Sequence, residues 1–161
     1  MAVDMSLPLT SRLLELGEGL RRSVGARLHL VHSLPYKKAY YSMEEGSLER
    51  RSAREARDVE VRSVMQELRA ILGDAIDHWE IQIGEGPVVA DLGQVVEHRG
   101  IDLLVMGSVS RTGVPGLIVG NTAESVFARI DCPLWVIKPE GWVSPVPRED
   151  DHTKIVEKMI R

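Results

Sequence analysis

The chain lacks the features that would support a disulfide framework, a membrane span or a secretory leader. Its 161 residues include one cysteine, which cannot build a disulfide framework. No apolar run approaches the roughly 20 residues that a membrane-spanning helix needs. The first residues, Met1-Ala2-Val3-Asp4, show neither the basic nor the apolar region of a signal peptide. We therefore expect a single cytoplasmic domain in a reducing compartment.

A surplus of basic charge is also missing. The formal net charge is −4, whereas a nucleic-acid-binding domain normally carries a basic surplus gathered on one face. In the one arginine-rich segment, basic and acidic side chains alternate at helical spacing, at Glu49, Arg50, Arg51, Arg54, Glu55, Arg57, Asp58 and Glu60. This alternation indicates a solvated helix face. We expect neither nucleic acid nor a membrane as a partner.

What the sequence does contain is a regular alternation of helix and strand patterns. Apolar residues at helical spacing predict helices over residues 9–24, 49–72, 87–99 and 122–130. Short apolar or alternating segments predict strands over residues 27–32, 79–83, 101–106 and 133–138. Gly25, Gly73 and Gly100 stand where three of these helices should end. Pro87 suits the first position of its helix.

This order of elements predicts an α/β domain with an open, mostly parallel five-stranded sheet and helices on both faces. Ligands of such sheets bind at the carboxyl ends of the strands. A first strand should precede the first helix, but only Met1 to Val3 are available for it, and strands usually run to about five or six residues. We therefore expect a truncated first strand, in a chain that begins inside a longer parent.

The long helix predicted over residues 49–72 should turn one apolar face inward. The side chains on that face are Val61, Val64, Met65, Leu68, Ile71 and Leu72.

Four glycines, Gly107, Gly113, Gly116 and Gly120, lie in the segment that follows the strand at residues 101–106. Glycine permits positive φ and lets backbone N–H groups approach a ligand closely. The run Asn121-Thr122-Ala123-Glu124 predicts a capped helix whose N-terminus would attract an anion. One interpretation is a phosphate-binding loop, and the other is a tight connection that binds nothing.

Several motifs resemble the universal stress protein family. They are Val3-Asp4-Met5-Ser6, Leu30-Val31-His32, the segment 102–108, the glycine loop and the segment 132–139. The resemblance covers residues 1–139 and implies the adenine nucleotide hydrolase-like fold. It leaves residues 140–161 as a C-terminal extension with an extended segment and a short amphipathic helix. The run from Gly120 to Glu124 is most similar to the branch with two such domains in one chain, and we expect this domain to correspond to the C-terminal one.

The resemblance also implies a site for ATP. In ATP-binding members the loop reads G-x-x-G, then a spacer, then G-S or G-T. Gly107 and Gly120 match, while Ser110 replaces the middle glycine and Asn121 replaces the hydroxyl residue. Both replacements fall on phosphate contacts, so they weaken the case for ATP. The candidate binding residues are Asp4, Ser33, Met106, Gly107, Ser110, Gly120, Asn121 and Thr122.

Two of these candidates belong to the adenine end of the implied site. Asp4 matches the family's acidic residue after the first strand, although it would serve equally well as a helix cap. Ser33 stands where valine is common, at a contact made largely through backbone.

No catalytic or metal-binding set emerges from the sequence. Cys132 has no local histidine partner, and His29 and His32 should point to opposite faces of a strand. The resemblance implies a regulatory, binding protein of the stress response that acts by association and small-ligand sensing. The alternative is an ATP-binding protein with weak or slow ATPase activity. A nucleotide-dependent transferase would need a general base that the sequence does not nominate.

The resemblance implies a partner as well. In this family the last strand commonly pairs with its counterpart in a second domain. We therefore expect a homodimer, or pairing with a second universal stress domain, through Leu134 to Lys138.

Overall fold

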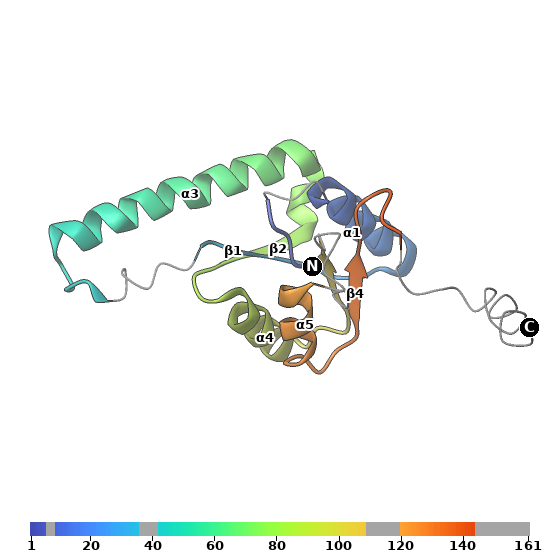
Figure 1. The fold of residues 1–161 in the computed structure, drawn as a ribbon. Helices are drawn as coiled ribbons and strands as arrows, with labels where there is room; N and C mark the ends of the chain where they lie inside the picture. Colours follow the sequence, from blue (N-terminus) through green and yellow to red (C-terminus); the bar gives the residue numbers. More distant parts are fainter. Residues whose placement is uncertain (6–8, 36–41, 109–119, 144–161) are drawn as a thin grey trace, which may run out of the picture.

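The computed structural model describes residues 1–5, 9–35, 42–108 and 120–143, which form an α/β domain (Figure 1). The elements follow one another as α1 (Thr10–Val24), β1 (Leu28–Ser33), α3 (Leu48–Leu72), the 3₁₀ helix η1 (Gly73–His78), β2 (Trp79–Gly84), α4 (Val88–Arg99), β3 (Leu104–Gly107), α5 (Asn121–Phe127) and β4 (Leu134–Ile137). The helix predicted in the C-terminal extension lies outside the described residues.

All strand pairing is parallel. β1 pairs with β2 from Leu28↔Trp79 to Ser33↔Gly84. β3 pairs with β4 from Leu104↔Leu134 to Gly107↔Ile137. This is the α/β class and the parallel pairing that the sequence predicts.

The segment Met1–Val3 joins the two strand pairs. Ala2 forms parallel bridges to Val31 of β1 and to Met106 of β3. The amide of Ala2 donates to the carbonyl of Val105 at 2.8 Å, and the amide of Val3 donates to the carbonyl of Val31 at 3.0 Å. The segment predicted as a truncated first strand therefore lies between β1 and β3. It is joined to them through isolated bridges, and the described residues contain four strands.

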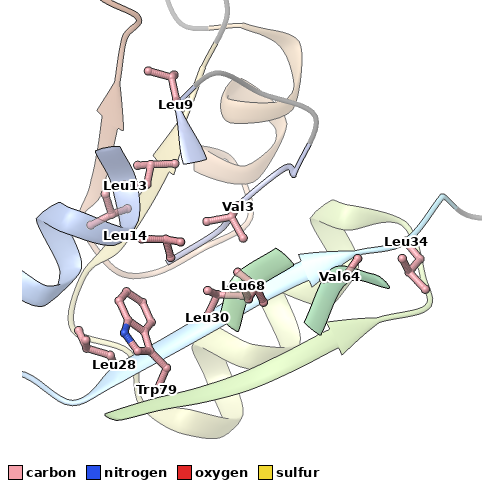
Figure 2. Close-up of a cluster of buried hydrophobic side chains, with 11 residues drawn as sticks. Val3, Leu9, Leu13, Leu14, Leu28, Leu30, Leu34, Val64, Leu68 and Trp79 are labelled. Atoms are coloured by element: carbon pink, nitrogen blue, oxygen red, sulfur yellow. The ribbon is translucent and has the colours of Figure 1, made fainter. Parts of the chain in front are cut away.

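Two apolar clusters lie on opposite faces of these strands. Successive strand residues point to opposite faces, so Leu30 and Val31 of β1 belong to different clusters. Leu30 packs with side chains from α1, α3 and β2, among them Leu13, Leu14, Leu68 and Trp79 (Figure 2). Val31 packs with side chains from α4, β3 and α5, among them Leu92, Val95, Met106 and Val126. Helices thus cover both faces.

The helix ends follow the predicted signals at all three glycines, and Gly73 follows the last residue of α3 with φ of 56°. Gly25 after α1 and Gly100 after α4 have φ of 68° and 58°, the left-handed conformation that glycine adopts without strain. The prediction for Pro87 is wrong by one position. It is the N-cap of α4, with an extended ψ of 130°, and Val88 is the first helical residue.

The inward face predicted for the long helix is only partly buried. Val64 and Leu68 of α3 are buried, but Ile71 is 37% exposed. The first half of α3 extends beyond the strands, so its apolar residues have nothing to cover (Figure 1). Leu48 at its start is 79% exposed for this reason.

Candidate functional site

A cavity of about 380 Å³ opens where β1 and β3 end. It is lined by seven of the eight predicted binding residues, namely Asp4, Ser33, Met106, Gly107, Gly120, Asn121 and Thr122. The eighth, Ser110, lies outside the described residues, as does Gly113. The fold therefore gathers residues from four separate stretches of the sequence at one place.

The cavity has an apolar part between the strands and α4. Val31 of β1 and Met106 of β3 form one side, and Val88 and Leu92 of α4 form another. Val31, Leu92 and Met106 belong to the same buried cluster, so their positions are fixed by the core. Small-molecule sites are typically apolar clefts with a few polar groups at their edges. This part of the cavity therefore offers an apolar surface to a ligand.

Asp4 lies at the polar edge of the cavity and is exposed. Its main-chain carbonyl oxygen accepts a hydrogen bond from Thr10 Oγ1 at 2.9 Å. α1 begins at Thr10, and its N-cap residue Leu9 makes no side-chain cap hydrogen bond. Asp4 is therefore not the N-cap of α1, and it lines the cavity.

Ser108 and Gly120 meet at the opposite edge. Gly120 has φ of 106°, and a Cβ atom there would lie 2.7 Å from Ser108 Oγ. Both the backbone conformation and the close contact require glycine at this position. Because Ser108 is only 6% exposed, it cannot easily move aside.

Lys138 and Trp142 extend this edge beyond the cavity. Lys138 Nζ donates to Ser108 Oγ at 3.3 Å, and it lies 5.2 Å from the centroid of the Trp142 ring. Burial lowers the pKa of the Lys138 ammonium. The cation and the ring together tie the segment after β4 to the residue that follows β3. Local sequence patterns do not reveal this contact, because 30 residues separate Lys138 from Ser108.

The helix cap predicted at Asn121 is also wrong. The N-cap of α5 is Gly120, with no side-chain hydrogen bond, and Asn121 is the first helical residue. Asn121 and Thr122 are exposed and line the cavity. Both residues are therefore accessible from the cavity.

A second polar contact that the sequence analysis missed lies behind the apolar part of the cavity. Ser33 Oγ donates to Asp91 Oδ2 of α4 at 2.8 Å. The amide of Gly86 donates to both carboxylate oxygens of Asp91, at 3.2 Å each. A Cβ atom at Gly84 would lie 2.1 Å from Asp91 Oδ2. The glycines of the β2–α4 turn therefore leave room for this carboxylate.

His29 and His32 occupy structural positions. His32 is buried, and its Nδ1 lies 2.9 Å from the carbonyl oxygen of Val3. His29 Nδ1 lies 3.4 Å from Glu80 Oε2, and burial lowers the pKa of His29 although the Glu80 carboxylate opposes the shift. Across residues 1–5, 9–35, 42–108 and 120–143, no three His, Cys, Asp or Glu side chains are grouped as a metal ion would require.

Cys132 is half-buried against the cluster that contains Val126, and it is not among the residues that line the cavity. In the part of the chain that the structure describes, no helix has the length and apolar character to cross a membrane.

Comparison with known proteins extends these observations. The family model for the universal stress protein family matches residues 1–138. Universal stress protein E of Escherichia coli strain K12 is 40% identical over 65 residues, which cover 40% of this chain and 20% of that protein. Universal stress protein E of Salmonella typhi is 36% identical over 80 residues, or 50% of this chain and 24% of that protein. The matched segment is therefore a small part of these curated relatives.

Solved structures show the same fold. A universal stress protein from Archaeoglobus fulgidus superposes with a TM-score of 0.61 at 20% identity, over 85% of this chain and 95% of that one. A universal stress protein in complex with cAMP superposes with a TM-score of 0.53 at 16% identity, over 86% and 93% of the two chains. The family match spans nearly all of the described residues and includes every side chain that lines the cavity. The chain belongs to the universal stress protein family.

Proposed function

We propose that this stress-response protein binds a nucleotide in the cavity at the ends of β1 and β3, and that binding is its function. The observation that carries the proposal is the convergence of seven predicted binding residues on one cavity of about 380 Å³. Such a volume lies within the range of roughly 300–1,000 Å³ that small-molecule sites occupy. The cAMP complex of a universal stress protein with this fold supports a nucleotide as the ligand class.

The two ends of the cavity suit the two ends of a nucleotide. The base would lie against Val88 and Leu92, and the phosphates would lie near Gly107 and Gly120, where main-chain atoms are accessible. ATP is the nucleotide that we propose. Among the described lining residues, Asp4 is the one carboxylate and none is a histidine or lysine. This composition supports binding with slow hydrolysis at most.

Calorimetric titration with ATP and Mg²⁺, and separately with cAMP, tests this proposal. We expect saturable heat and a rise in melting temperature at nucleotide concentrations up to the millimolar range, since a ligand that binds only the folded state stabilises it. Absence of both signals at millimolar nucleotide would reject nucleotide binding.

The altered phosphate contacts supply a second experiment. We expect the double variant Ser110→Gly, Asn121→Ser to bind ATP about tenfold more tightly, because it removes a Cβ atom and adds a hydroxyl where the family uses one. A tenfold change corresponds to about 1.4 kcal/mol, the scale of one hydrogen bond. Unchanged affinity in a folded double variant would show that these two positions do not limit binding.

We also propose that β4 forms the contact between two copies of this domain. Among the described strands β4 pairs with β3 alone, and Trp135 on it is 44% exposed. An uncovered apolar edge strand readily pairs with another chain. Light scattering should therefore give the mass of a dimer at micromolar concentration, and Trp135→Lys should shift it toward the monomer. Leu48→Lys changes an exposed residue of α3 and should leave the dimer intact, whereas a monomeric wild type would exclude the contact.

A further inference from the structure

The hydroxyl group of Ser33 is held in one orientation. Ser33 ends β1 and lines the cavity, and its Oγ lies 2.8 Å from Asp91 Oδ2. A carboxylate can only accept hydrogen bonds, so the hydroxyl hydrogen of Ser33 must point toward Asp91. The remaining hydrogen-bonding capacity of Ser33 Oγ is that of an acceptor.

Asp91 is itself fixed on two sides. The amide of Gly86 donates to both of its oxygens at 3.2 Å, which anchors the carboxylate to the β2–α4 turn. The backbone of Gly84 lies so close that a Cβ atom there would be 2.1 Å from Oδ2. The carboxylate therefore has little freedom to turn away from Ser33, and a ligand cannot easily reverse the direction of the Ser33–Asp91 hydrogen bond.

The side chains beside the Ser33 hydroxyl oxygen are apolar. Val31, Val88 and Leu92 line the same part of the cavity and offer a ring no competing polar group. We propose that Ser33, oriented by Asp91, selects ligands whose ring edge donates a hydrogen bond, such as an amino-substituted heterocycle, over ligands with a carbonyl at the same place. This inference rests on the proposed function, since it names the feature of the nucleotide base that the cavity recognises.

A ligand with a carbonyl group at the same place binds less tightly. The carbonyl oxygen faces the oxygen of Ser33, whose hydrogen is engaged by Asp91. The hydroxyl must then leave the carboxylate, or two acceptors must lie in contact. An acceptor that is buried in the complex without a hydrogen-bond donor lowers the affinity for the ligand by about tenfold or more.

ATP and inosine triphosphate are the probes of this effect, because they differ at one edge of the base alone, where the amino group and the acceptor N1 of adenine are replaced by a carbonyl and an N1–H donor. Calorimetric titration of the whole chain should show the wild type binding ATP at least about tenfold more tightly than inosine triphosphate. Ser33→Ala removes the acceptor and leaves the contact between Asp91 and Gly86 in place. The ratio of the two dissociation constants should fall toward one in this variant.

Asp91→Asn gives the sharper result. The amide oxygen of asparagine can still accept from Gly86, while its NH₂ group donates to Ser33 Oγ and releases the hydroxyl hydrogen toward the cavity. We expect this variant to lose the preference for ATP or to reverse it. Asp102→Asn makes the same chemical change at an exposed residue that does not line this cavity, and it should keep the wild-type ratio.

The outcomes distinguish failure of the role of Ser33 from failure of nucleotide binding. Equal affinities in the wild type, or an unchanged ratio in Ser33→Ala and Asp91→Asn, overturn the role of Ser33 while nucleotide binding stands. No binding of either triphosphate overturns the proposed function and this inference together. Thermal unfolding of each variant shows whether it is folded, and if Asp91→Asn is not, the ratio measured for Ser33→Ala decides.

Discussion

Replacing Gly120 with alanine is expected to lower nucleotide affinity more than tenfold and to destabilise the fold by about 2–4 kcal/mol. The φ of 106° at this residue lies where a side chain is strained, and the new Cβ atom would lie 2.7 Å from Ser108 Oγ. Ser108 is buried and bonded to Lys138, so relief requires the backbone at Gly120 to move. That movement displaces Asn121 and Thr122, which line the cavity. Urea unfolding and ATP titration measure the two effects.

Gly25→Ala is the matched control for this substitution. Gly25 also has a positive φ, 68°, but a Cβ atom there would meet no atom within 4 Å. Its backbone strain alone should cost about 1–2 kcal/mol and leave nucleotide affinity unchanged. If Gly120→Ala loses no more stability than Gly25→Ala and binds nucleotide normally, the close contact with Ser108 has no structural role.

Leu68→Ala is expected to lower the free energy of unfolding by about 2–5 kcal/mol, the range for truncating a fully buried leucine. Leu68 is 0% exposed and belongs to the cluster that contains Leu30 and Trp79 (Figure 2). It is one of the two buried residues by which α3 packs on the rest of the domain. Because small domains have only about 5–15 kcal/mol of stability, a loss of this size is a large fraction of the total.

The same helix supplies the control. Leu48→Ala makes the identical chemical change at a leucine that is 79% exposed, and we expect a change within about 0.5 kcal/mol. Urea unfolding of both variants, followed by circular dichroism, gives the comparison. Similar losses for Leu48→Ala and Leu68→Ala would contradict the placement of Leu68 in the core.

The order of elements could be predicted because it depends on local signals. Apolar residues repeat at helical spacing in α1 and α4, and Gly25 and Gly100 mark their ends with the left-handed conformation expected of glycine there. How far a helix face is buried is a tertiary property. The periodicity of α3 could not reveal that Ile71 would remain 37% exposed, since nothing in the helix itself says how much of it overlies the strands.

The candidate site was predictable only where it follows a motif. Gly107 and Gly120 stand in the glycine loop, and the cavity brings them together with Asp4 and Ser33. The contact between Ser33 and Asp91 spans 58 residues and depends on the pairing of β1 with β2, which places Ser33 opposite Gly84. No spacing in the sequence encodes such a contact. It appears only when the strand register is known.

The bridges at Ala2 have a consequence for how the domain fluctuates. β1–β2 with α3 and β3–β4 with α5 lie on either side of these bridges, and both apolar clusters take side chains from both sides. The cavity takes lining residues from both sides, Ser33 from one and Met106 from the other. A ligand bound in the cavity therefore stabilises the association of the two sides, because separating them would break its contacts. Ligand binding is in this way thermodynamically coupled to the separation of the two sides, and it makes the unfolding of the domain more cooperative.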